Sequence, residues 1–469
     1  MLLHVLSAVI AFAVAPVTGA ARDPARDPVH AERPIGSPHA MPARVAFARR
    51  AHVDSLTAAE RALARAVDQR TALAIALLER IVNINSGTMN FAGVRQVGDI
   101  LRARLDLLGF RTRWEDGAPF GRAGHLIAEH AAKGPKLLLI GHLDTVFEPT
   151  SPFQKMERLA DSTARGPGII DMKGGDVIII VALEALQAAG LLERMNVTVV
   201  MHGDEEHAGD PQPLARAALV AAARGAHAAI GFEDGAGDVR TAVVARRGAG
   251  SWRLDVTGEA AHSSQIFKDS IGYGAIFETA RILDAFRTRL SNEAYLTFNP
   301  GVALGGARLT LDAAANKGTV EGKNNIVAER MTVQGDLRTL SPEQLTRAQQ
   351  TMREIVAQHL GHTTATITFE NGYPPMAPTE GNRQLLARHD QASRDLGLGA
   401  VTAVDPGKAG AADVSFVAGL VPMIIDGIGL AGHDDHAPQE TADLRSLSVR
   451  AKRAALTLYR LSRDAAPVP

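Results

Sequence analysis

Two adjacent glutamates, Glu205 and Glu206, come directly after a run of apolar residues. The segment is MHGDEEHAGD, and the four residues before it are VTVV. Neighbouring carboxylates repel each other, and burying either one without a partner is costly. The pair therefore lies either in a solvated loop or in a site where a cation compensates the two charges. Other parts of the sequence distinguish between these explanations.

Other side chains that can bind metal also follow short apolar runs, such as KLLLI, AAIGF and VPMII. Taken singly, each has an ordinary explanation; Asp171, for example, could cap the helix that follows it. Taken together, imidazole and carboxylate groups at the ends of several strands could hold two divalent ions. The chain has no cysteine, so thiolate ligands are excluded, and the donor types favour zinc, with cobalt or manganese as alternatives. The residues concerned are His142, Asp144, Asp171, Glu205, Glu206, Glu233, His433 and His436.

The elements that must position these groups are short strands and long helices in alternation. Runs that are apolar on both faces are typical of central strands in a sheet covered by helices on both sides. In such α/β sheets, ligands gather beyond the carboxyl ends of the strands. Helices are predicted from a capping signature at Ser55, over residues 93–109, and over residues 176–190.

The pattern changes near residue 243 to alternating, half-exposed strands interleaved with helices over 269–290 and 341–360. The order of strand, helix, strands, helix, strand predicts a small α+β domain inserted into the first one. The pattern of the outer domain resumes near Tyr373. The predicted organisation is a signal peptide (1–21), a disordered linker (22–54), a catalytic domain in two parts (55–242 and 373–465) and the inserted domain (243–372).

The bulk properties narrow the choice of partners. The chain has 469 residues, a formal net charge of −1 and a pI near 7.0, which indicate neither a nucleic-acid footprint nor a polybasic membrane surface. Partners are therefore expected to be small molecules. The apolar N-terminus, ending in small residues at Ala20 and Ala21, predicts a cleaved export signal, with an uncleaved anchor of marginal length as the alternative.

The motifs GHLDTV, GPGIIDMKGG, DEE, FED, GAADVSF and GHDDHAPQE occur in an order that resembles one known family. This is the superfamily of co-catalytic zinc metallopeptidases that contains glutamate carboxypeptidase, aminoacylase and succinyl-diaminopimelate desuccinylase. The resemblance covers roughly residues 60–465. It implies an α/β fold with a mixed sheet flanked by helices, and an inserted ferredoxin-like α+β domain that acts as lid and dimerisation module.

The resemblance also implies a role for each motif residue. Asp171 would bridge two zinc ions, with His142 and Glu233 on one ion and Glu206 and His436 on the other. Asp144 would orient His142, and Glu205 would be the general base. His436 is preferred over His433 because family members place this histidine four residues before a glutamate, here Glu440. In the inserted domain, the resemblance implies substrate contacts for His262, Asn325 and Arg338, and a homodimer.

The chain departs from the family pattern in places. Tyr373 in ENGYPPM stands where glutamate-releasing members place an arginine, so a preference for C-terminal glutamate is in doubt. Ala328 replaces a proline, and GKAGAADV is looser than the usual Gly-Gly-Thr-Asp, although Gly410 and Asp413 keep their places.

These observations predict an exported dizinc hydrolase that cleaves an amide bond of a peptide or an N-acyl amino acid, periplasmic or secreted and free of the membrane once mature. Carboxypeptidase or dipeptidase action is preferred over deacylation. The alternatives are an N-acyl-amino-acid deacylase and a non-catalytic binding protein of the same fold. A serine hydrolase is disfavoured because no Gly-x-Ser-x-Gly turn is evident.

Overall fold

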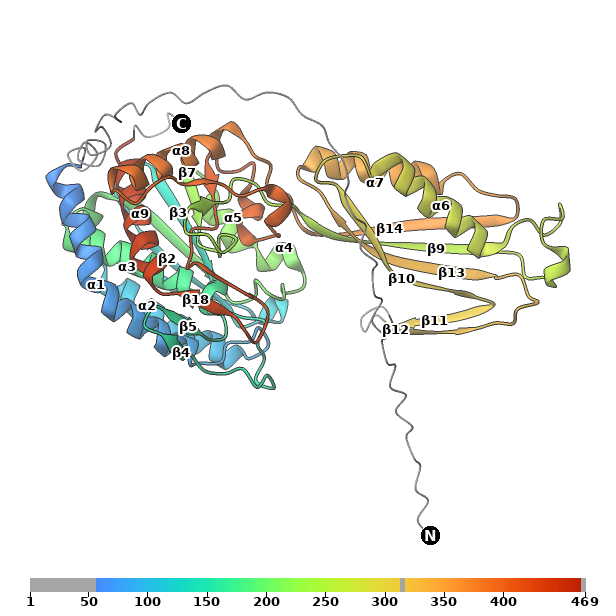
Figure 1. Cartoon of the computed structure of the whole chain (residues 1–469), viewed down its shortest axis with the longest axis horizontal. Helices are drawn as coiled ribbons and strands as arrows, with labels where there is room; N and C mark the ends of the chain where they lie inside the picture. Colours follow the sequence, from blue (N-terminus) through green and yellow to red (C-terminus); the bar gives the residue numbers. More distant parts are fainter. Residues whose placement is uncertain (1–55, 313–316, 465–469) are drawn as a thin grey trace, which may run out of the picture. The chain divides into compact units, whose positions relative to one another are not determined.

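A computed structural model of the chain describes residues 56–312 and 317–464. The predicted signal peptide and linker lie outside the described residues, as does residue 465. A six-stranded mixed sheet forms the centre of the α/β body (Figure 1). The pairs β6–β3, β3–β7 and β7–β16 are parallel, whereas β1–β2 and β2–β6 are antiparallel. The strands, in their order across the sheet, are β1 (Arg111–Asp116), β2 (Gly124–His130), β6 (Asn196–His202), β3 (Lys136–His142), β7 (Ala226–Gly231) and β16 (Ile424–Ile425).

Helices and loops cover both faces of this sheet, as the doubly apolar strands predict. Successive residues of β3 point to opposite faces: Leu137 and Leu139 join one hydrophobic cluster, and Leu138 and Ile140 join another. The second cluster includes residues of α5 (Ala217–Ala223). Helices contributing to the first cluster are α1 (Ala58–Val82), α2 (Phe91–Leu107), α3 (Gly174–Ala188), α8 (Glu380–Asp395) and α9 (Arg445–Leu461).

Helix α1 illustrates how local sequence sets an element boundary. It begins at Ala58, and Thr57 is its N-cap. The Thr57 hydroxyl accepts from the Glu60 amide at 3.2 Å, and the Thr57 amide donates to the Glu60 carboxylate at 2.7 Å. This reciprocal capping box satisfies two amides that the helix itself leaves free, which confirms the predicted start to within a few residues.

The inserted unit comprises a four-stranded antiparallel sheet with two helices on one face. Its chain order is strand, helix, strand, strand, helix, strand, and its sheet order is β10-β13-β9-β14, which is the ferredoxin-like arrangement. Alternate residues of β9, among them Trp252 and Leu254, pack beneath the helices. The elements are β9 (Ala249–Gly258), α6 (Gly274–Leu290), β10 (Thr297–Gly306), β13 (Arg330–Arg338), α7 (Pro342–Val356) and β14 (Thr363–Tyr373).

The remaining strands form small sheets. A hairpin of β11 (Arg308–Asp312) and β12 (Lys317–Glu321) lies between β10 and β13 in the chain. A second four-stranded sheet in the α/β body has the order β17-β18-β5-β4 (Gly432–His433, Thr441–Asp443, Thr163–Arg165, Glu157–Ala160), and β8 (Thr241–Ala242) pairs with β15 (Thr402–Ala403).

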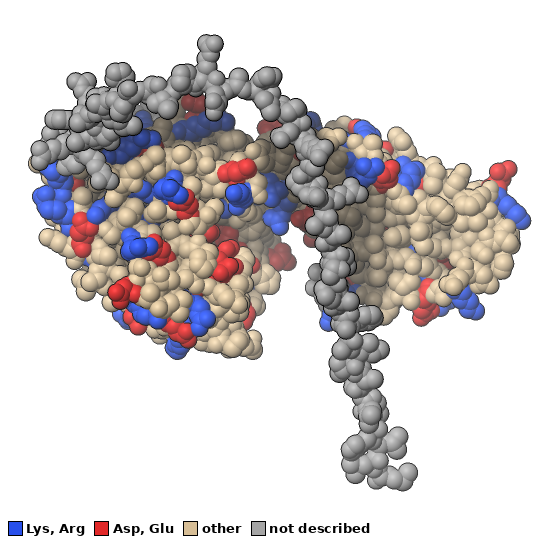
Figure 2. Space-filling view, in the orientation of Figure 1, with Lys and Arg blue, Asp and Glu red and all other residues tan. Residues whose placement is uncertain are grey.

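The surface carries both signs of charge. Lysine, arginine, aspartate and glutamate are intermixed on the visible face of the α/β body (Figure 2). In the described part of the chain, no helix combines the length and apolar character needed to cross a bilayer.

Candidate metal centre

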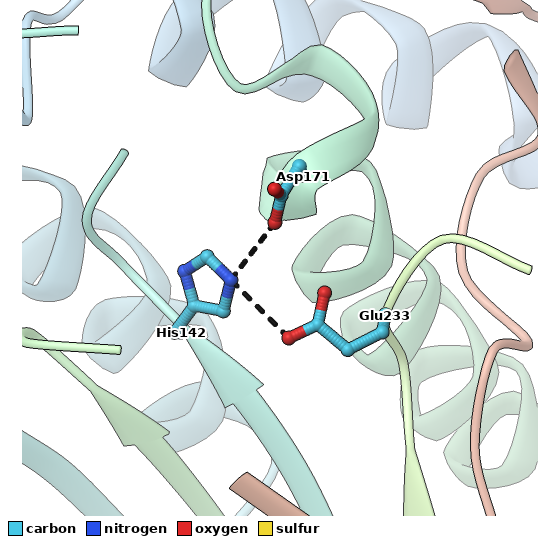
Figure 3. Close-up of side chains that lie close together, drawn as sticks. All are labelled: His142, Asp171 and Glu233. Carbon is cyan, nitrogen blue, oxygen red and sulfur yellow. Dashed lines mark hydrogen bonds and ion pairs between the residues drawn. The ribbon is translucent and has the colours of Figure 1, made fainter. Parts of the chain in front are cut away.

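Three side chains from separate elements converge at the carboxyl end of the central sheet (Figure 3). His142 is the last residue of β3, and Asp171 lies in a helical turn just before α3. Glu233 follows β7. Nε2 of His142 lies 3.1 Å from Oδ1 of Asp171 and 3.3 Å from Oε1 of Glu233. All three residues are buried, and their donor atoms lie close enough to share one ion.

A second histidine approaches Asp171 from its other oxygen. Nε2 of His436 lies 2.9 Å from Oδ2 of Asp171 and 3.2 Å from Oε2 of Glu206. His436 has φ of 59°, a left-handed conformation that is uncommon for a residue with a side chain. His433 lies elsewhere, with Nδ1 2.7 Å from the neighbouring Asp434. The structure therefore pairs His142 with Glu233 and His436 with Glu206, and Asp171 stands between the two pairs.

Buried carboxylates hold the turns that carry these side chains. Asp144 accepts hydrogen bonds from the amides of Glu205 and Glu206 at 3.0 and 3.1 Å. Glu440 accepts from the amides of Gly168, Ile170 and Asp171 at 2.8, 2.8 and 3.2 Å. The candidate ligands are therefore oriented through their own backbone.

Asp426 orients Glu233 through its backbone in the same way, because Oδ1 of Asp426 accepts from the Glu233 amide at 3.3 Å. Asp144 also contacts His142: Nδ1 of the imidazole lies 3.1 Å from the carbonyl oxygen of Asp144 and 3.5 Å from its carboxylate. The backbone bonds of Glu440 and Asp426 were not predicted from the sequence. The spacing of four residues between His436 and Glu440 was the one available signal, and it served only to choose the histidine.

Five of the predicted residues line one pocket of about 260 Å³. Two lysine or arginine side chains line it. Arg246 is bound to Asp426 at 2.7 Å, whereas the exposed Lys408 forms no ion pair with any described residue. A larger hollow of about 820 Å³ lies on the inserted sheet, but the metal-capable clusters found among the described residues are not part of it. Predicted residues that line the smaller pocket are Asp171, Glu205, Glu206, Glu233 and His436.

The electrostatics of the pocket are those of carboxylates crowded together away from water. Burial, followed by the charge of Asp171, raises the pKa of Glu206 to about 7. Burial, with Asp171 again contributing, raises the pKa of Glu233 to about 8 despite the nearby His142. Burial and then the charge of Asp413 raise the pKa of Glu205 well above its usual range. Hydrogen bonds to Asp171 and Glu206 raise the pKa of His436 to about 11.

The donor set fits divalent cations. Oε1 of Glu206 is buried and has no hydrogen-bond partner, so one oxygen of this carboxylate is left for a ligand. Burial raises the pKa values of Glu206 and Glu233, so a bound cation would favour the ionised forms of both carboxyls. Imidazole and carboxylate donors without thiolate suit zinc, cobalt or manganese.

A buried arginine, Arg216, contacts Tyr373 in the structure, although no arginine is near Tyr373 in the sequence. Nη1 of Arg216 donates to Asp204 at 2.6 Å, and Nε lies 2.9 Å from Asp413. Nη2 of Arg216 donates to the Tyr373 hydroxyl at 2.8 Å. Asp413, the residue retained from the Gly-Gly-Thr-Asp pattern, also bonds to His202. These contacts join residues as many as 211 positions apart, so no local sequence signal could have shown them.

The three residues predicted to contact substrate belong to the inserted unit and do not line the pocket. His262 and Asn325 are neighbours: the Ser263 amide donates to the Asn325 carbonyl at 2.9 Å, and His262 forms a bridge with Ile326. Nδ1 of the exposed His262 lies 2.9 Å from the Ser264 hydroxyl. Nε of Arg338 lies 3.3 Å from Asp336, so this guanidinium already has an acidic partner. Their contacts with substrate stay predictions.

Comparison with known proteins agrees with this geometry. The family model described as "Peptidase family M20/M25/M40" matches residues 138–460, more than half of the chain. Carboxypeptidase G2 of Pseudomonas sp. (strain RS-16) is 26% identical over 398 residues, covering 83% of this chain and 89% of that protein. A succinyl-diaminopimelate desuccinylase of Xanthomonas campestris is 28% identical over 368 residues, covering 74% and 89% respectively.

Solved structures share the fold. Aminopeptidase PepT from Bacillus cereus aligns with a TM-score of 0.66 at 16% identity, covering 84% of this chain and 99% of that one. A Bacillus subtilis protein described as a dinuclear metal-binding peptidase of the M20 family aligns with a TM-score of 0.59 at 15% identity, with coverage of 84% and 99%. The chain belongs to peptidase family M20/M25/M40, and it is a metal-dependent peptidase or amidohydrolase.

Proposed function

We propose that this protein is an exported dizinc hydrolase that cleaves an amide bond next to a free carboxylate, in a peptide or an N-acyl amino acid. The observation that carries the proposal is the shared position of Asp171. Its two oxygens face two different histidines, and each histidine is accompanied by its own glutamate. A single-ion site would have no need of the second pair.

The ligand sets follow from these contacts. His142, Glu233 and one oxygen of Asp171 would hold one ion, and His436, Glu206 and the other oxygen of Asp171 would hold the second. Two bound zinc ions would supply the positive charge that these carboxyls need and the Lewis acidity that activates water and polarises a carbonyl group. Asp144, Glu440 and Asp426 keep Glu206, Asp171 and Glu233 in place by accepting from their backbone amides.

Glu205 is proposed as the general base. Its carboxyl group lines the same pocket as Asp171 and Glu206 but belongs to neither pair. A carboxylate at this point can take the proton from the attacking water and later deliver it to the leaving amine. The adjacent glutamates of the DEE motif thus divide the work, because one binds metal and the other moves a proton.

Lys408 supports a substrate with a free carboxylate. Its ammonium group is the pocket-lining cation that no described acidic residue neutralises. An unpaired cation at the pocket would attract a carboxylate and place it beside the reacting bond. This argument favours a substrate with a free carboxylate, and the named activity of carboxypeptidase G2 favours carboxypeptidase or dipeptidase action on it. Deacylation of an N-acyl amino acid would present the same carboxylate and is the second candidate.

Export and dimerisation complete the proposal. Export rests on the N-terminal sequence alone and predicts that protein recovered from the periplasm or medium begins near residue 21. A homodimer through the inserted unit is expected from the family resemblance. An exposed aromatic cluster on this unit supports it: Phe267 lies 5.4 Å from Phe277 and 5.7 Å from Tyr273, ring centre to ring centre. Analytical ultracentrifugation of the wild type and Phe277→Ser tests this expectation.

Metal content per chain is the first test of the proposed function. The wild type should retain about two zinc ions, and His436→Ala should lose the ion held with Glu206. His433→Ala is the matched control, since it removes a nearby histidine that faces away from Asp171, and it should keep the full content. Equal losses in both variants, or a wild type that binds no zinc when zinc is supplied, would contradict the proposed site.

Substrate class is tested with matched substrates. Dipeptides and N-acyl amino acids are compared with the same compounds carrying a C-terminal amide. The proposal expects hydrolysis of the free acids and a much lower kcat/KM for the amides. Lys408→Met should raise KM for the acids and leave the amides unchanged. If the amides are cleaved as well as the acids, the pocket does not select a carboxylate.

A further inference from the structure

The peptide group between Glu205 and Glu206 is held at both of its polar atoms. Its N–H belongs to Glu206 and donates to Oδ2 of Asp144 at 3.1 Å. Its C=O belongs to Glu205 and accepts from the Tyr373 hydroxyl at 2.7 Å. Because a peptide group is planar and its C=O and N–H point in opposite directions, these two bonds fix the plane from both sides.

Fixing the plane of this peptide group sets the directions in which the side chains of Glu205 and Glu206 leave the backbone. Their Cα atoms lie at the two ends of the peptide group, so a rotation of the plane would displace both carboxyl groups. One of them must stay beside His436, where Oε2 of Glu206 lies 3.2 Å from the imidazole. The other must face the reacting water. With Asp144 alone, the plane would be held at one edge and free to tilt about that contact.

Tyr373 is itself held in the orientation that this contact needs. Its hydroxyl oxygen accepts from Nη2 of Arg216 at 2.8 Å, so its single proton is left for the Glu205 carbonyl. Arg216 is fixed by Asp204 and Asp413. The ring of Tyr373 packs against Phe416 with 4.9 Å between ring centres. The hydroxyl group is therefore pre-organised by the buried Arg216 and by the packing of the ring.

We propose that Tyr373 is a positioning residue for Glu205, acting through the Glu205 carbonyl to hold the base in line with the reacting water. The inference rests on the proposed role of Glu205 as general base. It also assigns a role to the departure seen in the sequence: where glutamate-releasing members of the family place an arginine, this chain has a tyrosine that donates to the protein's own backbone. The position then serves orientation and leaves carboxylate binding to other groups.

Tyr373→Phe removes the hydroxyl and keeps the ring. Misplacing a catalytic group by about 1 Å costs on the order of 100-fold in rate, so we expect kcat to fall roughly 10- to 100-fold. KM and zinc content should stay near the wild-type values, because the substrate pocket and the metal ligands are not removed. Tyr295→Phe, at an exposed tyrosine of the inserted unit, is the matched control and should leave kcat unchanged.

A double variant separates positioning from a general structural effect. If Tyr373 works through Glu205, then Tyr373→Phe should cost little or nothing when Glu205→Gln is already present. If the two losses multiply, the proposal is wrong. Should Tyr373→Phe not fold, Phe416→Leu loosens the ring while keeping the hydroxyl, and it should lower kcat several-fold at constant KM; a wild-type kcat for that variant would contradict the proposal.

Different results would overturn the proposed function and the role of Tyr373. A wild type that hydrolyses none of the substrates overturns the proposed function, and the role of Tyr373 falls with it. An active wild type together with a folded, zinc-loaded Tyr373→Phe of unchanged kcat overturns the role of Tyr373 alone. A rise in KM with unchanged kcat would make Tyr373 a substrate-binding residue, which also contradicts positioning.

Discussion

The α/β body and the inserted unit are both built by packing helices on a sheet, yet they place charge in opposite ways. The body buries acids and bases completely: Asp144, Asp204 and Arg216 are each no more than 1% exposed. In the described part of the inserted unit, Glu278 is the one buried charged side chain. Its core is built mainly from apolar residues such as Trp252, Phe286 and Met352, and its other buried polar side chains are uncharged threonines and glutamines.

This difference shows where the molecule gives up stability for chemistry. Burying a charge carries a desolvation cost that paired partners only partly offset. In the body, the buried carboxylates that carry this cost orient the turns bearing the candidate metal ligands, and the buried Arg216 orients Tyr373. The inserted unit bears no such site among its described residues and, apart from Glu278, buries no charged side chain there. Matched substitutions in the two regions can test this contrast.

The largest expected effect is on activity. Glu205→Gln keeps the shape of the side chain but removes the proton acceptor, so kcat should fall by about 100- to 10,000-fold. Zinc content should not change, because Glu205 is not among the proposed ligands. The matched change Glu370→Gln, on an exposed residue of β14, should leave kcat at the wild-type value. Comparable losses in the two variants would contradict a specific role for Glu205 in the body.

The next effect is on stability. Arg216→Met should lower the free energy of unfolding by about 3–5 kcal/mol, because it leaves Asp204 and Asp413 buried without their cation. Arg287→Met breaks a surface pair with Asp284, whose side chains are 69% and 66% exposed, and it should cost less than about 1 kcal/mol. Urea unfolding measures both. A surface variant as damaging as the buried one would remove the contrast between the regions.

A smaller, pH-dependent effect is expected at His389 in α8. This imidazole is fully buried beside Arg450 and Arg453, and burial followed by those charges lowers its pKa to about 3. The folded protein therefore keeps His389 neutral, whereas the unfolded chain binds a proton below about pH 6.5. Stability from this group is complete above pH 6.5 and is lost as the pH falls toward 3, by up to about 1.4 kcal/mol per pH unit.

His389→Gln tests this pH dependence by removing the titrating group. Between pH 6.5 and 4.5, its free energy of unfolding should fall less steeply than that of the wild type. His362→Gln, at an exposed histidine of the inserted unit, should keep the wild-type slope. If His389→Gln and the wild type lose stability in parallel, the buried histidine is not a source of acid sensitivity.

The sequence predicted the parts of this molecule that rest on local patterns. The run KLLLI became β3, and its alternate residues face two cores. Metal-binding side chains were predicted to gather at the carboxyl ends of the strands, and the family resemblance grouped His142, Asp171 and Glu233 around one ion. The structure brings these three side chains together. The choice of His436 over His433 agrees with the geometry, since His436 faces Asp171. The roles assigned to these residues stay predictions.

What the sequence did not predict depends on contacts between distant residues. The backbone bonds that Glu440 makes span about 270 positions, and the pair Arg216–Tyr373 spans 157. A strand was predicted to start soon after residue 242, but β9 starts at Ala249. Arg246 is bound instead to Asp426 and pairs with the backbone of Met376, so partners elsewhere in the fold override the local pattern.

The smallest expected effect is one that the two regions should share. Thr57 caps α1 in the body, and Ser341 caps α7 in the inserted unit; each side chain accepts from the third amide after it, at 3.2 and 3.1 Å. Each change to alanine should lower stability by about 1 kcal/mol, because an N-cap bond acts locally. Thermal unfolding of the two variants measures the shifts. Equal losses would mean that the two regions differ only in their buried charges. A much larger loss at Thr57 would mean that a local change in the body also weakens distant contacts. The ion pair between Glu60, the capping-box partner of Thr57, and Arg460 at 2.8 Å would carry that effect.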